Sequence, residues 1–151
     1  MRKASFSKVE IFRIRPAARG DEAALSRMDP HIGRKERERA LLLRRIYVAE
    51  RAGRVVGCLR YNLFWDNTPF LNLLYVEKDF RGRGVGGQLL RFFEEKMRAR
   101  SYSAVMTSTQ AAESARYFYA SQGYTIVGGF WPEGEGYELL LSKTLDGKTA
   151  G

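Results

Sequence analysis

An arginine- and glycine-rich stretch over residues 81–88 offers the clearest chemistry in the chain, because its residue types suit a phosphate ligand. It follows an apolar segment over 70–76 and precedes an amphipathic segment over 89–97. Glycines let the backbone approach a bulky ligand closely, and the first turn of a helix has N–H groups free to bind anions. Arg81 and Arg83 add permanent positive charge in a geometry suited to phosphate oxygens. The order strand, glycine-rich turn, helix therefore predicts a site for a phosphate or pyrophosphate group.

Two nucleotide-binding motifs do not match this stretch. A P-loop needs a Lys followed by Ser or Thr at its end, whereas Gly87 is followed by Gln88 and Leu89. The dinucleotide fingerprint G-x-G-x-x-G is formally present, but it expects an acidic residue about 20 positions later to bind a ribose. The corresponding segment, 106–110, contains no acid, and the fingerprint lies in mid-chain. A glycine-rich basic turn without any ligand is the remaining structural alternative.

The segments around this stretch predict an α/β protein. Periodicity and turn residues indicate strands over 9–15, 46–51, 54–64, 70–76, 104–109, 124–130 and 137–144. Helices are expected over 21–28, 34–44, 89–97 and 111–122. We expect Asp21 to cap the first helix, Pro16 to end the first strand, and Gly123 to end the last helix. The strand over 70–76 is apolar on both faces apart from Asn72, as expected of a central strand.

Composition indicates one folded domain in a reducing compartment. A chain of 151 residues with 44% apolar residues can bury a core, and we expect one domain over 1–151 with its core over about 9–145. The single cysteine, Cys58, allows no intramolecular disulfide, and residues 1–14 have no apolar signal-peptide region. No apolar run approaches the roughly 18 residues of a membrane span. These features predict a cytoplasmic location and no membrane partner.

The formal net charge of +9 is compatible with nucleic acid, an anionic membrane surface or an anionic ligand. Much of the excess lies over 34–45, where acids are interleaved with arginines, which is typical of a solvated helix face. A surface for single-stranded nucleic acid would also need base-stacking aromatics among the basic residues, and only Tyr47 lies near this run. Nucleic acid is therefore not the expected partner, and attraction of a polyanionic cofactor is the simpler reading.

The pattern Arg81-x-x-Gly84-x-Gly86 resembles the pyrophosphate loop of the GNAT superfamily of N-acetyltransferases, which has Arg or Gln, two residues, Gly, one residue, and Gly or Ala. The segment 114–124 is similar to the family pattern Asn-Ala-x-x-aliphatic-Tyr-x-x-x-Gly-aromatic, with Ser114 where Asn is common. Two further segments, 64–70 and 107–110, look like those of an uncharacterised bacterial subgroup. The resemblance implies the GNAT fold, a mixed sheet of about seven strands with helices on both faces and a splayed fourth strand.

The resemblance also implies acetyl-CoA as co-substrate. Backbone groups of 74–76 would bind the pantetheine arm, and amides of 83–88 would bind the pyrophosphate. The implied cofactor-binding residues are Leu74, Tyr75, Val76, Arg81, Arg83, Gly84, Val85, Gly86, Gly87, Gln88, Ser114 and Tyr117.

Tyr119 matches the family tyrosine and is the implied general acid. A neutral phenol with a reference pKa near 10 can donate a proton to the departing sulfur. The structural alternative is an amphipathic ring packed between helix and sheet. Some family members place a Glu base early on the fourth strand, where this chain has Phe70. The remaining candidate bases are Glu77 and Glu50, and the structural alternative for each is a surface or salt-bridge carboxylate.

Catalysis through a cysteine or a metal is not expected. A reactive thiolate needs a partnering His or a positive environment, and the only histidine, His31, lies in a predicted loop. Cys58 is better read as a small apolar strand residue. The chain has no Cys/His cluster that would hold a metal.

The resemblance predicts an acetyl-CoA-dependent N-acetyltransferase. It would transfer the acetyl group to a primary amine, of a small molecule or a peptide, by direct attack in a ternary complex. The alternatives are a catalytically inactive CoA-binding module and a basic nucleic-acid-binding module. Many relatives are dimers, so a homodimer is compatible with the resemblance.

Overall fold

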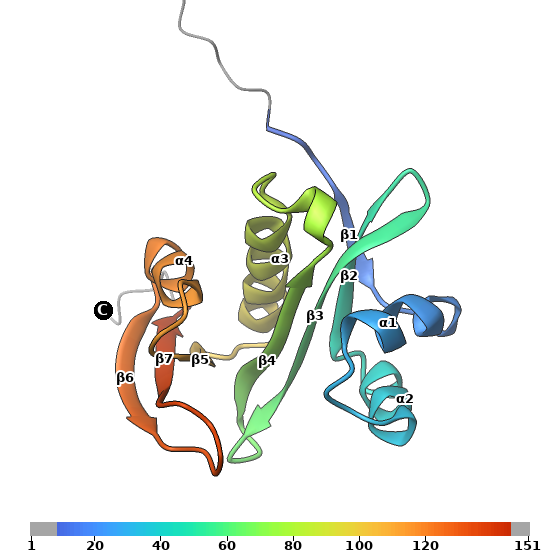
Figure 1. Ribbon diagram of the computed structural model, residues 1–151. Coiled ribbons are helices and arrows are strands. Elements are labelled where there is room, and N and C mark those ends of the chain that lie inside the picture. Colours follow the sequence, from blue (N-terminus) through green and yellow to red (C-terminus); the bar gives the residue numbers. More distant parts are fainter. Residues whose placement is uncertain (1–8, 146–151) are drawn as a thin grey trace, which may run out of the picture.

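A seven-stranded sheet in the order β1-β2-β3-β4-β5-β7-β6 forms the centre of the computed structural model, which describes residues 9–145 (Figure 1). The strands are β1 (Arg13–Pro16), β2 (Ile46–Arg51), β3 (Arg54–Phe64), β4 (Thr68–Val76), β5 (Ala104–Gln110), β6 (Thr125–Phe130) and β7 (Glu138–Thr144). All neighbouring strands are antiparallel except β4 and β5, which run parallel. The mixed sheet confirms the predicted fold class. The ends of the predicted domain, 1–8 and 146–151, lie outside the described residues.

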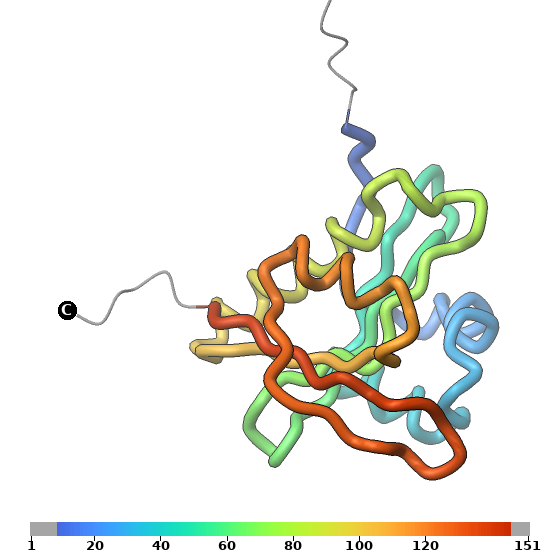
Figure 2. The backbone as a smooth tube through the Cα atoms, turned by 60° about the vertical axis from the view of Figure 1, so that its left-hand side comes forward, coloured from blue at the N-terminus to red at the C-terminus, as the bar shows by residue number. Residues whose placement is uncertain are grey.

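Helices cover both faces of the sheet. They are α1 (Glu22–Met28), α2 (Arg34–Leu42), α3 (Val85–Ala99) and α4 (Ala115–Ser121), with the short 3-10 helices η1 (Arg19–Asp21) and η2 (Lys78–Phe80). Helices α1 and α2 lie on one side of β2–β4 and α3 lies on the other (Figure 1). Figure 2 brings α4 and the β6–β7 hairpin to the front, in orange and red. None of the helices in the described part of the chain has the length and apolarity needed to cross a bilayer.

Two apolar clusters hold these layers together. Under α3, the side chains of Leu89, Leu90, Phe93 and Met97 are fully buried at helical spacing. Under α1, residues Leu25 and Met28 pack on Ile46, Val48 and Cys58 of the sheet. Burial raises the pKa of the Cys58 thiol to about 12, so this side chain behaves as a small apolar residue, as expected.

Strands β4 and β5 separate soon after they meet. Their paired residues are Phe70 with Met106 and Leu71 with Thr107, and the rest of β4 has no partner in β5. On the other side of β4, Leu71 opposes Tyr61 while Leu73 opposes Arg60, so Asn72 is the extra residue of a β-bulge. The splayed fourth strand expected from the resemblance is thus confirmed.

Several element boundaries differ from expectation. Helix α3 begins at Val85 rather than at residue 89, because Gly86 and Gly87 continue the helix. Helix α4 is shorter than the expected 111–122. Strand β1 includes Pro16, which was expected to end it; an edge strand tolerates the missing N–H on its open side. Gly123 follows α4 with φ +93°, so its expected role at the helix end is confirmed.

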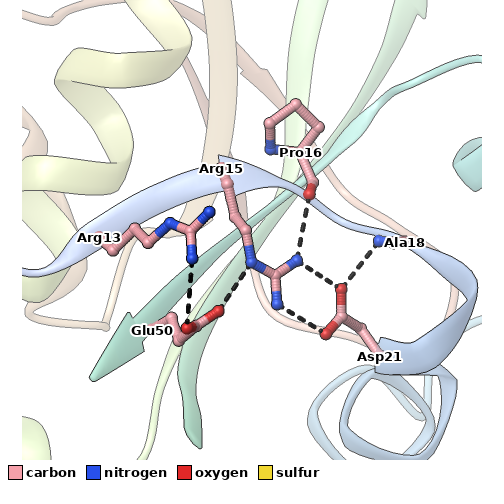
Figure 3. A network of polar contacts seen from close by, with 6 residues as sticks. All are labelled: Arg13, Arg15, Pro16, Ala18, Asp21 and Glu50. Carbon is pink, nitrogen blue, oxygen red and sulfur yellow. Dashed lines mark hydrogen bonds and ion pairs between the residues drawn. The ribbon is translucent and has the colours of Figure 1, made fainter. Parts of the chain in front are cut away.

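The carboxylate of Asp21 caps the turn before α1 rather than α1 itself, so the expected helix cap was wrong. It accepts a hydrogen bond of 2.8 Å from the backbone N–H of Ala18 and two from Arg15, of 2.8 and 3.0 Å (Figure 3). Arg15 also donates to Glu50 of β2 at 2.8 Å, and Arg13 lies 3.7 Å from the same carboxylate. This network joins β1, β2 and the beginning of α1, and it fixes α1 on its side of the sheet.

Candidate functional site

A pocket of about 530 Å³ lies between the unpaired end of β4 and the beginning of α3. Strand β4 contributes its last residues, η2 and the glycine-rich loop form one wall, and α4 contributes a single aromatic ring. The lining residues are Leu74, Tyr75, Val76, Phe80, Arg81, Gly82, Gly84, Val85, Gly86, Gly87 and Phe118. The separation of β4 from β5 leaves the strand end free to contact a ligand in this pocket.

The backbone of the loop before α3 lines the pocket at Gly82 and Gly84. Gly82 and Gly84 have φ values of +74° and +86°, which favour glycine. Gly84 is the N-cap of α3 and has no side chain to occupy the first N–H groups of the helix. These amides and the positive end of the helix dipole suit a phosphate. Arg81 is held beside the loop, since its Nε donates to the carbonyl of Val76 at 2.9 Å.

The absence of a side chain at Gly86 keeps this pocket open. A Cβ atom at this position would lie 3.7 Å from the ring of Phe118, 3.8 Å from Leu74 and 3.9 Å from Val76. These are ordinary van der Waals distances, so an alanine fits, but a longer side chain would extend among the lining residues. The first turn of α3 thus combines N–H groups that can bind a pyrophosphate with space for the chain attached to it.

Most of the predicted cofactor-binding residues meet at this pocket. Those in the lining are Leu74, Tyr75, Val76, Arg81, Gly84, Val85, Gly86 and Gly87. The side chains of two other predicted residues form hydrogen bonds with the N-terminal segment instead. Arg83 donates to the carboxylate of Glu10 at 3.0 and 2.7 Å. Gln88 donates to the carbonyl of Glu10 at 2.6 Å and accepts from the N–H of Phe12 at 3.0 Å.

Ser114 and Tyr117 lie outside the lining, at the start of α4. The Tyr117 side chain is 63% exposed and contacts Arg116, whereas the next residue, Phe118, reaches the pocket. The sequence reading missed Phe118, Phe80 and Gly82. The apolar ring of Phe118 beside the predicted tyrosine was the one available signal, because helix α4 must bury one of its faces.

Tyr119 is buried near the point where β4 and β5 separate. Its ring is 6% exposed and packs edge-on against Tyr124, with ring centroids 5.5 Å apart. Burial raises the pKa of the Tyr119 phenol, and the adjacent Thr107 hydroxyl acts in the opposite direction. Thr107 is the last β5 residue paired with β4, and it donates to the carbonyl of Leu71 at 3.0 Å. The phenol is therefore a neutral proton donor at physiological pH.

A buried carboxylate fixes the ring against which Tyr119 packs. The Tyr124 hydroxyl donates to Glu94 of α3 at 2.8 Å, and Lys143 of β7 donates to the other oxygen of Glu94 at 2.8 Å. The Glu94 side chain is 6% exposed in this arrangement. Three elements that are distant in sequence thus meet beside Tyr119.

The carboxylates considered as bases are engaged in ion pairs. Glu77, at the end of β4, accepts a hydrogen bond of 2.8 Å from Arg27 of α1. Glu50 belongs to the Arg15 network described above. His31 is exposed in the loop before α2. No group of three His, Cys, Asp or Glu side chains that could hold a metal ion occurs within residues 9–145.

Comparisons with known proteins agree on one family. A model described as "Acetyltransferase (GNAT) domain" matches residues 43–126. An uncharacterised N-acetyltransferase of Methanocaldococcus jannaschii is 32% identical over 107 residues, which cover 68% of each chain. The crystal structure of Ard1 from Thermoplasma volcanium has a TM-score of 0.79 at 18% identity, covering 90% of this chain and 99% of that one. A GNAT family acetyltransferase from Elizabethkingia anophelis with acetyl-CoA bound has a TM-score of 0.68 at 21% identity, covering 89% and 98%.

Proposed function

Since this chain belongs to the GNAT acetyltransferase family, we propose that it transfers the acetyl group of acetyl-CoA to a primary amine, by direct attack in a ternary complex. The observation that carries the proposal is the pocket between the unpaired end of β4 and the first turn of α3. It offers a strand edge for an amide-containing arm and a helix N-terminus for a pyrophosphate. A relative of the same fold was solved with acetyl-CoA bound.

In this proposal the first turn of α3 and Arg81 hold the pyrophosphate, and the edge of β4 holds the pantetheine arm. Over Leu74 to Val76 the edge of β4 that faces away from β3 has no strand partner, because β5 has departed from β4 before it. The Val76 carbonyl in this stretch accepts from Arg81 Nε. The arm leads the thioester toward the gap between the strands. Along this path Phe118 provides an apolar surface, and Gly86 leaves space because it has no side chain.

The reaction joins the amine nitrogen to the acetyl carbon and breaks the carbon–sulfur bond. The nitrogen lone pair attacks the carbonyl carbon, and backbone donors stabilise the developing oxyanion. When the intermediate collapses, the carbon–sulfur electron pair goes to the sulfur. The sulfur takes a proton from the Tyr119 phenol, and the new amide nitrogen loses one proton. Holding both reactants in line supplies much of the acceleration, because the bound pair reacts as one molecule.

Glu77 is the proposed acceptor, through a chain of water molecules, of the proton that the protonated amine gives up before it attacks. Its carboxylate lies at the end of β4 and is oriented by Arg27. Glu77 releases this proton to solvent, and the proton that the amide nitrogen loses after the attack returns to the Tyr119 phenolate through solvent, so each turnover restores both groups.

Turnover distinguishes this proposal from a CoA-binding module that has lost catalysis. Purified protein is incubated with acetyl-CoA and a panel of primary amines, and release of free thiol is followed. We expect amine-dependent thiol release together with a matching acetylated product. Binding of acetyl-CoA without thiol release for any amine would support the inactive module instead.

A further inference from the structure

A pair of asparagine side chains lies at the point where β4 and β5 separate. Asn72 Nδ2 donates a hydrogen bond of 2.6 Å to Asn62 Oδ1 on β3, and both residues are exposed. Asn72 follows Leu71, the last β4 residue paired with β5, and it is also the bulged residue of β4. A bulge re-aims a side chain and is over-represented beside active sites. The pair therefore stands at the narrow end of the gap.

The face on which the pair lies follows from its neighbours. Tyr61 packs in the cluster under α3, whereas Arg60 donates to Asp29 at the end of α1 at 2.6 Å. Side chains alternate along a strand, so Asn62 shares the face of Arg60, and Asn72, bonded to it, lies there too. Leu74 of the pocket packs with the α3 cluster instead. The pair and the pocket thus flank the same gap from opposite faces of the sheet.

The chemistry of this pair suits a neutral amine. Its internal hydrogen bond uses one N–H of Asn72 and one lone pair of Asn62, which leaves Asn72 Oδ1 and the N–H groups of Asn62 available. An accepting oxygen takes an N–H of the amine and leaves the nitrogen lone pair free to attack. On the same face, Arg60 and Asp29 form a buried ion pair with each other, and the two asparagines carry exposed, uncharged amides.

We propose that the Asn62–Asn72 pair binds the acceptor amine on the face opposite the cofactor pocket. Asn72 Oδ1 accepts an N–H of the attacking nitrogen, and an N–H of Asn62 donates to a carbonyl oxygen on the carbon next to the amine-bearing carbon. The site therefore prefers primary amines whose amine-bearing carbon also carries a carbonyl group, such as amino amides, over plain alkylamines. This inference rests on the proposed acetyl transfer and adds to it the position and the chemical class of the acceptor.

The test compares two amines that differ in one group. Alaninamide carries a carboxamide where isopropylamine carries a methyl group. Thiol release is measured with each amine over a range of pH, and kcat/KM is expressed per neutral amine to remove the difference between their pKa values. We expect the wild-type protein to favour alaninamide by about tenfold, the size of one or two hydrogen bonds.

Variants of the pair separate its two roles. Asn72→Ala should raise the KM for both amines by about fivefold to tenfold, with kcat and the KM for acetyl-CoA unchanged. Asn62→Ala should remove the preference for alaninamide. Asn72→Asp keeps the oxygen that accepts the amine N–H, and a flip of the Asn62 amide lets it donate to the other carboxylate oxygen, so the KM should return to within about threefold of wild type. The control is Asn67→Ala in the β3–β4 turn, where the side chain accepts a hydrogen bond of 2.9 Å from the neighbouring Thr68 hydroxyl; it should change none of these constants.

Each outcome decides the inference. An amine KM that is the same in Asn72→Ala as in Asn67→Ala would overturn it, as would a wild-type protein that treats the two amines alike. Absence of acetyl transfer to any amine by the wild-type protein would refute the proposed function instead. The pair is then tested by saturation-transfer NMR of alaninamide on the protein with CoA. Binding that Asn72→Ala abolishes supports the site, whereas absent binding or binding unchanged in the variant overturns it.

Discussion

Arg27 Nη2 lies 2.8 Å from Oε1 of Glu77, so an ion pair joins helix α1 to the end of β4. The Glu77 side chain is 17% exposed in this pair, while that of Arg27 is 59% exposed. The arrangement holds a carboxylate beside the unpaired end of β4 and keeps it within reach of solvent. It therefore combines a fixed position with access to water, as a general base acting through water requires.

Glu77→Gln should lower kcat/KM for the acceptor by about 10²-fold at pH 7, since a positioned base contributes an effect of this size. The loss should shrink as the pH approaches the pKa of the amine, because the amine then arrives without its extra proton. Rate measurements from pH 6.5 to 10 check this. The control is Arg27→Gln, which keeps the carboxylate and should cost far less. A loss for Glu77→Gln that is constant over the whole pH range would contradict the role.

Tyr119→Phe should lower kcat by about 10²-fold while leaving the affinity for acetyl-CoA within about twofold, because the phenol acts only when the sulfur departs. Burial raises the pKa of Tyr119 above its ordinary value of 10.0, so the acid form persists at alkaline pH. We therefore expect kcat of the wild-type protein to stay constant as the pH rises to about 10. Unchanged turnover in Tyr119→Phe would leave the ring with a packing role alone.

Gly86→Leu should weaken the binding of acetyl-CoA without lowering the stability of the protein. Leucine has a higher helix propensity than glycine by about 0.5–1 kcal/mol, so the melting temperature should not fall. The longer side chain would extend among Phe118, Leu74 and Val76 and should weaken acetyl-CoA binding by more than about tenfold. Gly86→Ala, whose Cβ makes only ordinary contacts, should have a small effect, and Gly20→Leu, with nothing within 4 Å, serves as the control. An unchanged affinity for acetyl-CoA in Gly86→Leu would show that the cofactor does not bind in this pocket.

Asp21→Asn should destabilise the protein by about 2 kcal/mol at pH 7, because it weakens charged hydrogen bonds to Arg15. The Arg15 guanidinium holds the pKa of Asp21 below its ordinary value of 3.8. A group with a lowered folded-state pKa contributes stability above its unfolded-state pKa, and the contribution is lost as the pH falls through the folded-state value. Denaturant melts should therefore show the difference from wild type shrinking below pH 3.8.

The matched control for that experiment is Glu36→Gln on α2. Its ion pair with Arg39 spans 3.9 Å between two exposed side chains, and such pairs contribute little to stability. A loss of stability in Asp21→Asn that is independent of pH would show that the network acts through packing rather than charge.

The strands were predictable from the sequence because their apolar patterns and turns agree with one another. The hairpin of β2 and β3 was predicted with its observed limits, 46–51 and 54–64. Helix α3 was predicted to start late, since glycine has a low helix propensity. In the structure, burial of Val85 in the cluster under α3 holds the first turn of the helix and outweighs that propensity. Local preference could not reveal a helix start that is set by residues far along the chain.

The place of the glycine-rich loop beside a pocket was predictable, whereas the use of individual side chains was not. The spacing of Arg81, Gly84 and Gly86 depends on local backbone chemistry, and these residues line one pocket. Arg83 and Gln88 lie in the same stretch, but their partners come from residues 10–12. The bulge that isolates Asn72 depends on the register between β3 and β4, and one sequence carries no direct signal of register.

Direct binding of acetyl-CoA is the measurement that tests the central claim. Isothermal titration of acetyl-CoA into the wild-type protein, with NAD as the control ligand, measures it without any assumption about the acceptor. We predict one molecule of acetyl-CoA bound per chain, loss of this binding in Gly86→Leu, and no binding of NAD. Absence of acetyl-CoA binding, or equal binding by wild type and Gly86→Leu, would contradict the assignment of the pocket between β4 and α3.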